Sequence, residues 1–141
     1  MVDLDGCERT DGALAALSAA EHVVLGRAQA GRLLGQDPAD AAVAYGTYVV
    51  ETDGARGWRL HTPGGETGAG AALPVRARDA TGAGDCFVGC YLAELERGAR
   101  PLDAARFASV AAGLSCTRVG ARAGQPGRAE VAAALAGPPP R

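Results

Sequence analysis

The sequence predicts an α/β fold in which helices flank a mostly parallel sheet, and three observations support this prediction. Short apolar runs alternate with alanine-rich stretches of helical spacing, as in folds where each strand is followed by a helix. Two runs rich in β-branched and aromatic residues lie either side of a glycine-containing turn, which predicts a hairpin. Hydrophobic residues make up 48% and charged residues 21% of the 141-residue chain, so we expect a single packed domain.

The first elements form an alternating series. The apolar start of the chain predicts a short strand at residues 2–4, and the alanine-rich stretch that follows predicts a helix at 12–20. The run His-Val-Val-Leu at 22–25 is apolar on both faces, as in a buried strand. A helix at 28–34 ends at the glycine that follows it, and a short helix at 39–45 begins after an Asp-Pro break.

The middle of the chain predicts the hairpin. Residues 47–52 and 58–62 are the two strands, and the turn 53–57 between them contains two glycines. The glycine-rich segment 63–70 has no periodicity, and we interpret it as an exposed connection without chemistry.

Three helices are expected in the last part of the chain. Gly98 ends a helix at 86–97, Asp103 opens a helix at 103–116, and the final helix covers 128–135. Residues 1–136 would form one domain, and the proline-rich tail 137–141 is expected to be disordered.

Composition excludes several classes of function. The net charge is −2 and the isoelectric point about 5.6, and the arginines are scattered, so nucleic acid is not an expected partner. The chain starts with an acidic segment and has no apolar run near the roughly 20 residues that span a bilayer, so a cytoplasmic protein without membrane contact is expected. All 14 basic residues are arginine, which excludes a Walker lysine and Schiff-base chemistry from this chain.

The cysteines and histidines give only a weak metal signal. Cys86 and Cys90 are spaced to share one helical face, but apolar neighbours favour buried, unliganded thiols. His22 and His61 have no metal-ligand spacing to them, and we interpret both as packing or surface residues.

The most informative segment is residues 79–89, Asp-Ala-Thr-Gly-Ala-Gly-Asp-Cys-Phe-Val-Gly, where a small-residue turn runs into a helix. Backbone N–H groups of Gly82, Ala83 and Gly84 at a helix start attract an anion such as phosphate. Asp85 would repel that anion unless it has another task, and accepting a proton from an attacking hydroxyl is such a task. A glycine pair before a helix also occurs in purely structural turns, so the flanking acids carry the functional interpretation.

This segment closely resembles the C-terminal signature of the ribokinase-like (PfkB) carbohydrate kinases. Residues 52–57, Thr-Asp-Gly-Ala-Arg-Gly, are similar to the family's Thr-x-Gly-x-x-Gly nucleotide loop, and residues 117–121, Thr-Arg-Val-Gly-Ala, to its closing segment. The resemblance implies a ribokinase-like layered fold and ATP-dependent phosphoryl transfer to a hydroxyl of a sugar or nucleoside, with ATP and Mg²⁺ as cofactors.

Carried over by position, the resemblance implies a role for each matching residue. Asp85 would be the general base, and the backbone amides of Gly82, Ala83, Gly84 and Asp85 itself would form the anion hole. The nucleotide would be contacted by Thr52, Gly54, Gly57, Ser109 and Gly113. Asp79 and Thr81 resemble ligands of the monovalent cation, usually potassium, that some members use, and the backbone at 117–120 would complete its shell. Without the resemblance, a strand end and a turn cap would explain Thr52 and Asp79.

Three departures from the family accompany these matches. The family's Asn-x-x-Glu motif, which organises magnesium and phosphates, corresponds here to Gly26-Arg27-Ala28-Gln29, so the acidic group is lost. The position beside the adenine that is often asparagine is Ser109. Family members are about twice as long, so the chain would correspond to the C-terminal, ATP-binding half, without the sugar-binding residues and lid. A second chain could cover the face so exposed. The alternative function is a non-catalytic remnant that binds nucleotide or a partner.

Overall fold

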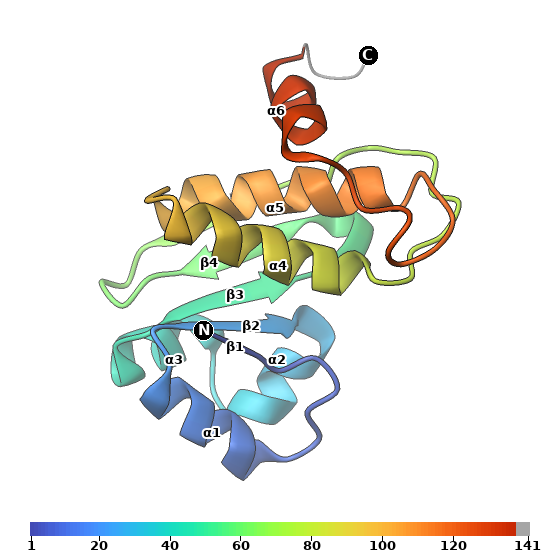
Figure 1. Cartoon of the computed structure of the whole chain (residues 1–141). Helices are drawn as coiled ribbons and strands as arrows, with labels where there is room; N and C mark the ends of the chain where they lie inside the picture. Colours follow the sequence, from blue (N-terminus) through green and yellow to red (C-terminus); the bar gives the residue numbers. More distant parts are fainter. Residues whose placement is uncertain (138–141) are drawn as a thin grey trace. The chain divides into compact units, whose positions relative to one another are not determined.

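The computed structural model describes residues 1–137, which fall into two compact units (Figure 1). Unit 1 comprises Met1–Gly70, and unit 2 begins at Ala71. Each unit has its own secondary structure and its own apolar cluster. The tail expected at 137–141 lies, apart from its first residue, outside the described part of the chain.

Unit 1 contains a mixed five-stranded sheet with the spatial order β1-β2-β3-β4-β5. β2 pairs in parallel with β1 and with β3, whereas β4 pairs antiparallel with β3 and with β5. The α/β class, the parallel strands and the hairpin predicted from the sequence are thus confirmed. The strands are β1 Val2–Asp3, β2 His22–Gly26, β3 Tyr48–Thr52, β4 Trp58–His61 and β5 Thr67–Gly70.

Three helices cover one face of this sheet in unit 1 (Figure 1). Their apolar sides meet the strands in a cluster of buried residues that includes Leu17, Leu33, Val23, Leu25 and Val49. The alternation of side chains along each strand directs these valines and leucines to the helical face. The helices are α1 Thr10–Ala19, α2 Arg27–Leu34 and α3 Pro38–Tyr45.

The segment 63–70 differs from its prediction as an exposed connection. Thr62 and Glu66 close a turn through a 2.8 Å backbone hydrogen bond, and Thr67–Gly70 then forms the edge strand β5. Gly70 lies against the ring of Trp58, where a Cβ atom would come within 2.6 Å of it. The strand was missed because strand propensity reflects side-chain packing, whereas this strand pairs through its backbone and needs small residues beside the indole.

The described part of unit 2 contains three helices, of which α4 and α5 pack side by side (Figure 1). Their contact includes a buried cluster of Cys86, Phe107 and Ala111, which Val131 of α6 completes. Arg128 of α6 donates hydrogen bonds to both oxygens of the buried Glu94 carboxylate on α4, at 2.9 and 3.1 Å. The helices are α4 Ala83–Glu96, α5 Pro101–Ser115 and α6 Arg128–Ala136.

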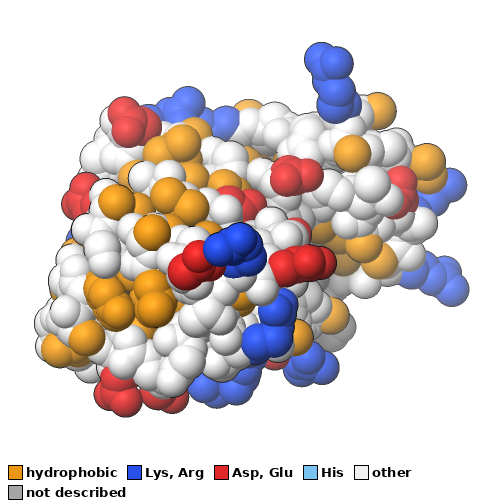
Figure 2. Space-filling model, turned by 90° about the horizontal axis from the view of Figure 1, so that it is seen from below, with side chains coloured by type: hydrophobic (Ala, Val, Ile, Leu, Met, Phe, Trp, Pro, Cys, Tyr) orange, Lys and Arg blue, Asp and Glu red, His pale blue; other side chains and the backbone are white. Residues whose placement is uncertain are grey.

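The length of the helices and the distribution of surface charge are relevant to membranes and nucleic acid as possible partners. None of the helices in the described range combines the length and apolar character needed to cross a bilayer. On the face shown in Figure 2, acidic and basic side chains are interspersed.

Candidate functional site

In unit 2, the turn before α4 is organised by the Asp79 carboxylate. Its Oδ1 accepts the N–H of Thr81 at 2.9 Å, and its Oδ2 accepts the N–H of Gly120 at 2.8 Å. A side-chain hydrogen bond from Thr81, together with these two backbone N–H groups, lowers the pKa of Asp79 to about 2. Asp79 therefore links its own turn to the segment after α5. Both segments, 79–89 and 117–121, resemble motifs of the family.

Gly82 gives the turn its shape. It lies immediately before α4 with a φ of +76°, and a Cβ atom there would come within 2.9 Å of the Ala121 side chain. Of the four predicted amides, that of Ala83 donates to the Ala80 carbonyl at 3.1 Å. Among the residues described, the N–H groups of Gly82, Gly84 and Asp85 donate to no protein acceptor, so they remain available to an anion at the start of a 14-residue helix.

Asp85 is exposed in the first turn of α4, where its carboxylate can reach a bound molecule. The next residue, Cys86, is buried and its thiol interacts with that of Cys90 one turn later. This thiol pair raises the pKa of Cys86 and lowers that of Cys90 to about 7, because a hydrogen bond within the pair favours ionisation of one member. Within the described range, no cluster of three or more histidines, cysteines or acids could hold a metal ion.

The two predicted nucleotide contacts on α5 both lie in packed positions. Ser109 is buried. Gly113 packs against Leu73, whose side chain lies 2.8 Å from the place a Cβ atom would occupy. Packing within unit 2 is therefore enough to explain the small size of Gly113.

The predicted nucleotide loop lies in unit 1, between the paired strands β3 and β4. Thr52 ends β3 and pairs with Trp58, and a 2.8 Å hydrogen bond from the Asp53 N–H to the Gly57 carbonyl closes the loop. Gly54 begins the short 3₁₀ turn η1, Gly54–Arg56, inside it. In the parallel register Thr52 also lies beside Gly26, the last residue of β2. The loop and the β2–α2 junction thus meet at the carboxyl ends of two parallel strands, where α/β folds bind their ligands.

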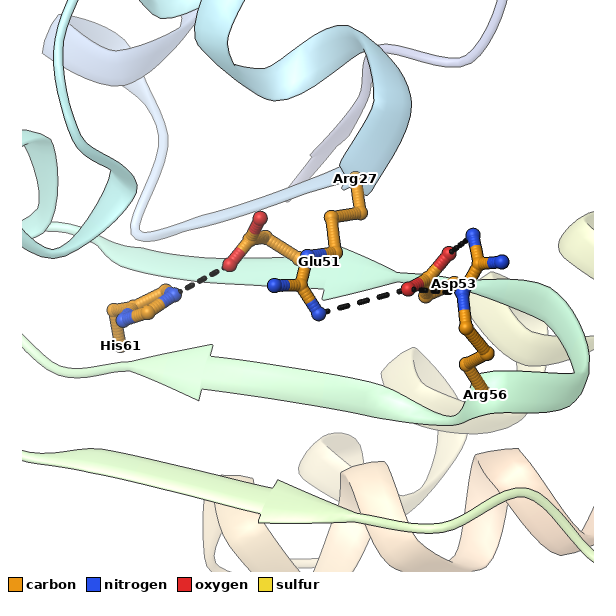
Figure 3. Close-up of polar contacts among 5 residues, drawn as sticks. All are labelled: Arg27, Glu51, Asp53, Arg56 and His61. Carbon is orange, nitrogen blue, oxygen red and sulfur yellow. Dashed lines mark hydrogen bonds and ion pairs between the residues drawn. The ribbon is translucent and has the colours of Figure 1, made fainter.

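A hollow of about 520 Å³ opens at this junction, lined by Arg27, Ala28, Asp53 and Arg56. Figure 3 shows the three charged side chains of this lining, Arg27, Asp53 and Arg56. Asp53 accepts two hydrogen bonds from Arg56, from Nε at 2.9 Å and Nη2 at 2.7 Å. Arg27, the first residue of α2, places Nη1 3.6 Å from the same carboxylate. The hydrogen bonds from Arg56, followed by the charges of Arg56 and Arg27, lower the pKa of Asp53.

These three charged residues were not among the predicted site residues. Arg27 lies in the segment 26–29, and Asp53 and Arg56 lie in the loop 52–57. The nucleotide-loop motif is defined by its threonine and glycines, so it does not identify the charged residues between them. The signal available in the sequence was the i, i+3 spacing of Asp53 and Arg56 within a turn. The participation of Arg27 depends on the pairing of β2 with β3 and could not be seen locally.

The same junction is a poor site for a divalent metal ion. Mg²⁺ is usually held by one or two carboxylates together with phosphate oxygens and waters. Asp53 is engaged by two arginines, and Gln29 offers a neutral amide. The Gln29 Oε1 atom is buried and has no hydrogen-bond partner among the described residues. The protein groups at this junction therefore do not fit a directly bound Mg²⁺.

Apart from Ser109 and Gly113 on α5, the predicted site residues form two groups. Asp79, Thr81 and the amides around Gly82 belong to one hydrogen-bonded turn in unit 2, which also carries Asp85. Thr52, Gly54 and Gly57 belong to the loop of unit 1.

Comparisons with known proteins agree with this architecture. The solved structures that match include a Thermotoga maritima ribokinase, with 26% identity and a TM-score of 0.79 over 94% of this chain and 47% of that one. An E. coli protein assigned as ribokinase II, solved with ATP and Mg²⁺, has 24% identity and a TM-score of 0.79 over 94% of this chain and 44% of its own. A Burkholderia thailandensis nucleoside kinase, solved with inosine, has 24% identity and a TM-score of 0.79 over 90% of this chain and 43% of its own. A search of curated proteins finds no match.

These matches cover nearly the whole of this chain but less than half of each kinase. The fold is therefore ribokinase-like. The sequence profile of the pfkB family carbohydrate kinases matches residues 4–128, which include the loop of unit 1 and the turn of unit 2. The chain therefore belongs to the pfkB family of carbohydrate kinases.

Proposed function

We propose that this chain is the C-terminal, ATP-binding part of a sugar or nucleoside kinase that transfers the γ-phosphoryl group of ATP to a hydroxyl. The observation that carries the proposal is the turn of unit 2. It presents the amides of Gly82, Gly84 and Asp85, which have no acceptor among the described residues, beside the exposed Asp85 carboxylate at the start of α4. Fixed N–H donors next to a general base are what phosphoryl transfer needs from a protein, because positioning and charge stabilisation dominate the reaction.

In the proposed reaction, Asp85 accepts the proton of the acceptor hydroxyl as its oxygen attacks the γ-phosphorus. The bond from that phosphorus to the β,γ-bridging oxygen breaks, so that ADP leaves and a phosphate ester forms. The amides of Gly82, Ala83 and Gly84 are assigned to the charge that develops on the transferring group. Ala83 can contribute only if its bond to Ala80 lengthens, so we assign the larger share to its two neighbours.

The remaining assignments belong to the nucleotide and the ions. We assign Thr52, Gly54, Gly57, Ser109 and Gly113 to nucleotide binding. Mg²⁺ is the proposed metal of the phosphoryl-transfer step, since the E. coli neighbour was solved with ATP and Mg²⁺. Asp79 and Thr81 are proposed ligands of a monovalent cation such as K⁺. The two N–H groups that Asp79 already accepts show that it also has a structural role.

The acceptor is proposed as a sugar or a nucleoside because the matching structures include ribokinases and a nucleoside kinase. Nucleic acid and membranes are not proposed as partners, and a cytoplasmic location accords with this soluble enzyme family. A second chain remains a proposed partner, since β1 and β5 are edge strands of the sheet.

The test is ATP-dependent phosphorylation over a panel of sugars and nucleosides, using γ-labelled ATP and long incubations. We expect label transfer by the chain and at least about a hundredfold less by Asp85→Ala, since a general base contributes about 10²–10⁴-fold. Asp40→Ala, which removes another exposed acid in the first turn of a helix, is the control. Equal background in all three proteins would contradict phosphoryl transfer by this chain.

A second candidate function, nucleotide binding without turnover, is favoured by one observation. Gln29 stands where the family resemblance places an acidic group, and Arg27 and Arg56 bring positive charge to the hollow at the same junction. Calorimetry separates the two functions. ATP binding without label transfer would identify a binding remnant, and partner capture by the chain would be tested next.

A further inference from the structure

Two guanidinium groups converge on one carboxylate at the hollow of unit 1, and we call Arg27 and Arg56 the arginine pair. Arg56 is anchored by two hydrogen bonds to Asp53 although its side chain is 81% exposed. Arg27 reaches the same carboxylate from α2, with its side chain 43% exposed (Figure 3). The Asp53 side chain is only 13% exposed, so the two guanidinium groups are more accessible to solvent than the carboxylate that holds them.

The donors of the arginine pair are only partly used. A guanidinium has five N–H donors, and Asp53 accepts from two nitrogen atoms on one edge of Arg56. The 3.6 Å separation between Arg27 Nη1 and Asp53 Oδ2 is an ion pair, longer than a normal hydrogen bond. One edge of Arg56 and the head of Arg27 can therefore donate to a ligand while Asp53 keeps both groups in place.

The charge and the size of the hollow specify the class of ligand. Two arginines and one aspartate leave an excess of one positive charge, and the N-terminus of the eight-residue helix α2 adds to it. Planar guanidinium groups match the oxygens of phosphate in bidentate geometry. A hollow of about 520 Å³ has room for more than one phosphate group. A chain of linked phosphates suits this site better than a carboxylate or a single small anion.

We propose that the arginine pair, oriented by Asp53, binds the polyphosphate of a nucleoside triphosphate and neutralises its charge without a divalent cation. The inference rests on the proposed function, which assigns the loop of unit 1 to the nucleotide. It goes further by naming the groups that hold the phosphates and by removing the requirement for Mg²⁺ in binding. Mg²⁺ is not required for binding because the junction offers it no free carboxylate: Asp53 is paired with arginine, and Gln29 is neutral.

The experiment is calorimetric titration of the full chain with ATP, ADP, AMP and inorganic tripolyphosphate, each in EDTA and in excess Mg²⁺. We expect ATP and tripolyphosphate to bind in EDTA at least as tightly as in Mg²⁺, and affinity to fall from ATP through ADP to AMP. Arg27→Ala and Arg56→Ala should each weaken tripolyphosphate binding about tenfold, the usual effect of losing a charged hydrogen-bonding group.

Arg9→Ala is the matched control. Arg9 also donates two hydrogen bonds to an aspartate, Asp11, and is 80% exposed in the same unit, but it lies outside the hollow. Its loss should leave tripolyphosphate binding unchanged. Circular dichroism of each variant confirms that the comparison is made between folded proteins.

The outcomes separate this inference from the proposed function. If ATP binds only with Mg²⁺ and both arginine variants match Arg9→Ala, the inference is overturned while nucleotide binding stands. If tripolyphosphate binds through the arginine pair as tightly as ATP does, the inference stands and the assignment of a nucleoside site falls. If neither ligand binds, both fail.

Discussion

Asp79 has a structural task that can be measured at the level of one residue. Its carboxylate accepts N–H groups from Thr81 and Gly120, which are far apart in the sequence, and its pKa is lowered to about 2. The unfolded chain would bind a proton near the ordinary value of 3.8. Ionised Asp79 therefore stabilises the native turn above about pH 4, and this contribution disappears as the pH falls through about 2.

We expect Asp79→Asn to remove that contribution, because the amide keeps one acceptor and loses the charge. The thermal midpoint of the variant should fall below that of the wild type at pH 6, and the two should converge as the pH approaches 2. Asp40→Asn, which removes an exposed acid of α3, is the control. A constant difference between wild type and Asp79→Asn from pH 6 to pH 2 would contradict the role of the ionised carboxylate.

At the scale of secondary-structure elements, a buried polar pair joins two strands of unit 1. Glu51 on β3 and His61 on β4 lie on the same sheet face, with His61 Nε2 2.7 Å from Glu51 Oε2 (Figure 3). His61 Nδ1 lies 3.0 Å from the hydroxyl of Thr67 on β5. The pair thus links three adjacent strands, and Glu51 directly precedes the loop that begins with Thr52.

We expect His61→Leu to lower the free energy of unfolding by about 3–5 kcal/mol, because it leaves the buried carboxylate without its partner. The double variant Glu51→Leu/His61→Leu should recover most of that loss, since two apolar side chains replace the pair. Urea unfolding followed by the fluorescence of the single tryptophan, Trp58 on β4, reports on these strands. Additive losses in the double variant would show that the two residues are not coupled.

At the scale of the whole molecule, the chain spans 43–47% of the length of the kinases it resembles. Phosphoryl transfer depends on holding the acceptor hydroxyl in line with the phosphate, and orientation contributes about 7–11 kcal/mol in well-positioned reactions. We therefore expect this chain to bind nucleotide but to phosphorylate ribose at least about 10⁵-fold more slowly than a full-length ribokinase.

The measurement is initial rate under single-turnover conditions, with the Thermotoga maritima ribokinase as the benchmark and Asp85→Ala to define the background. A rate within about a hundredfold of the benchmark would mean that this chain holds its acceptor well and would overturn the expectation. Such a result would mean that units 1 and 2 themselves contain the acceptor-binding residues.

The sequence by itself determined the helices of the described range and strands β1 to β4, together with the residue types of the two loops, because these depend on local properties. Periodicity, helix-ending glycines and the Asp79 to Asp85 turn are readable from neighbouring residues. They were enough to predict the α/β class, the hairpin and the resemblance to the family that the profile match established.

Only the tertiary structure decided which distant side chains meet. The pairing of β2 with β3 brings Arg27 to Asp53, and the pairing of β3 with β4 brings His61 to Glu51. Edge strand β5 also forms because β4 offers it a backbone to pair with. Strand register is set by burial across a whole sheet, so contacts that depend on register cannot be derived from either segment alone.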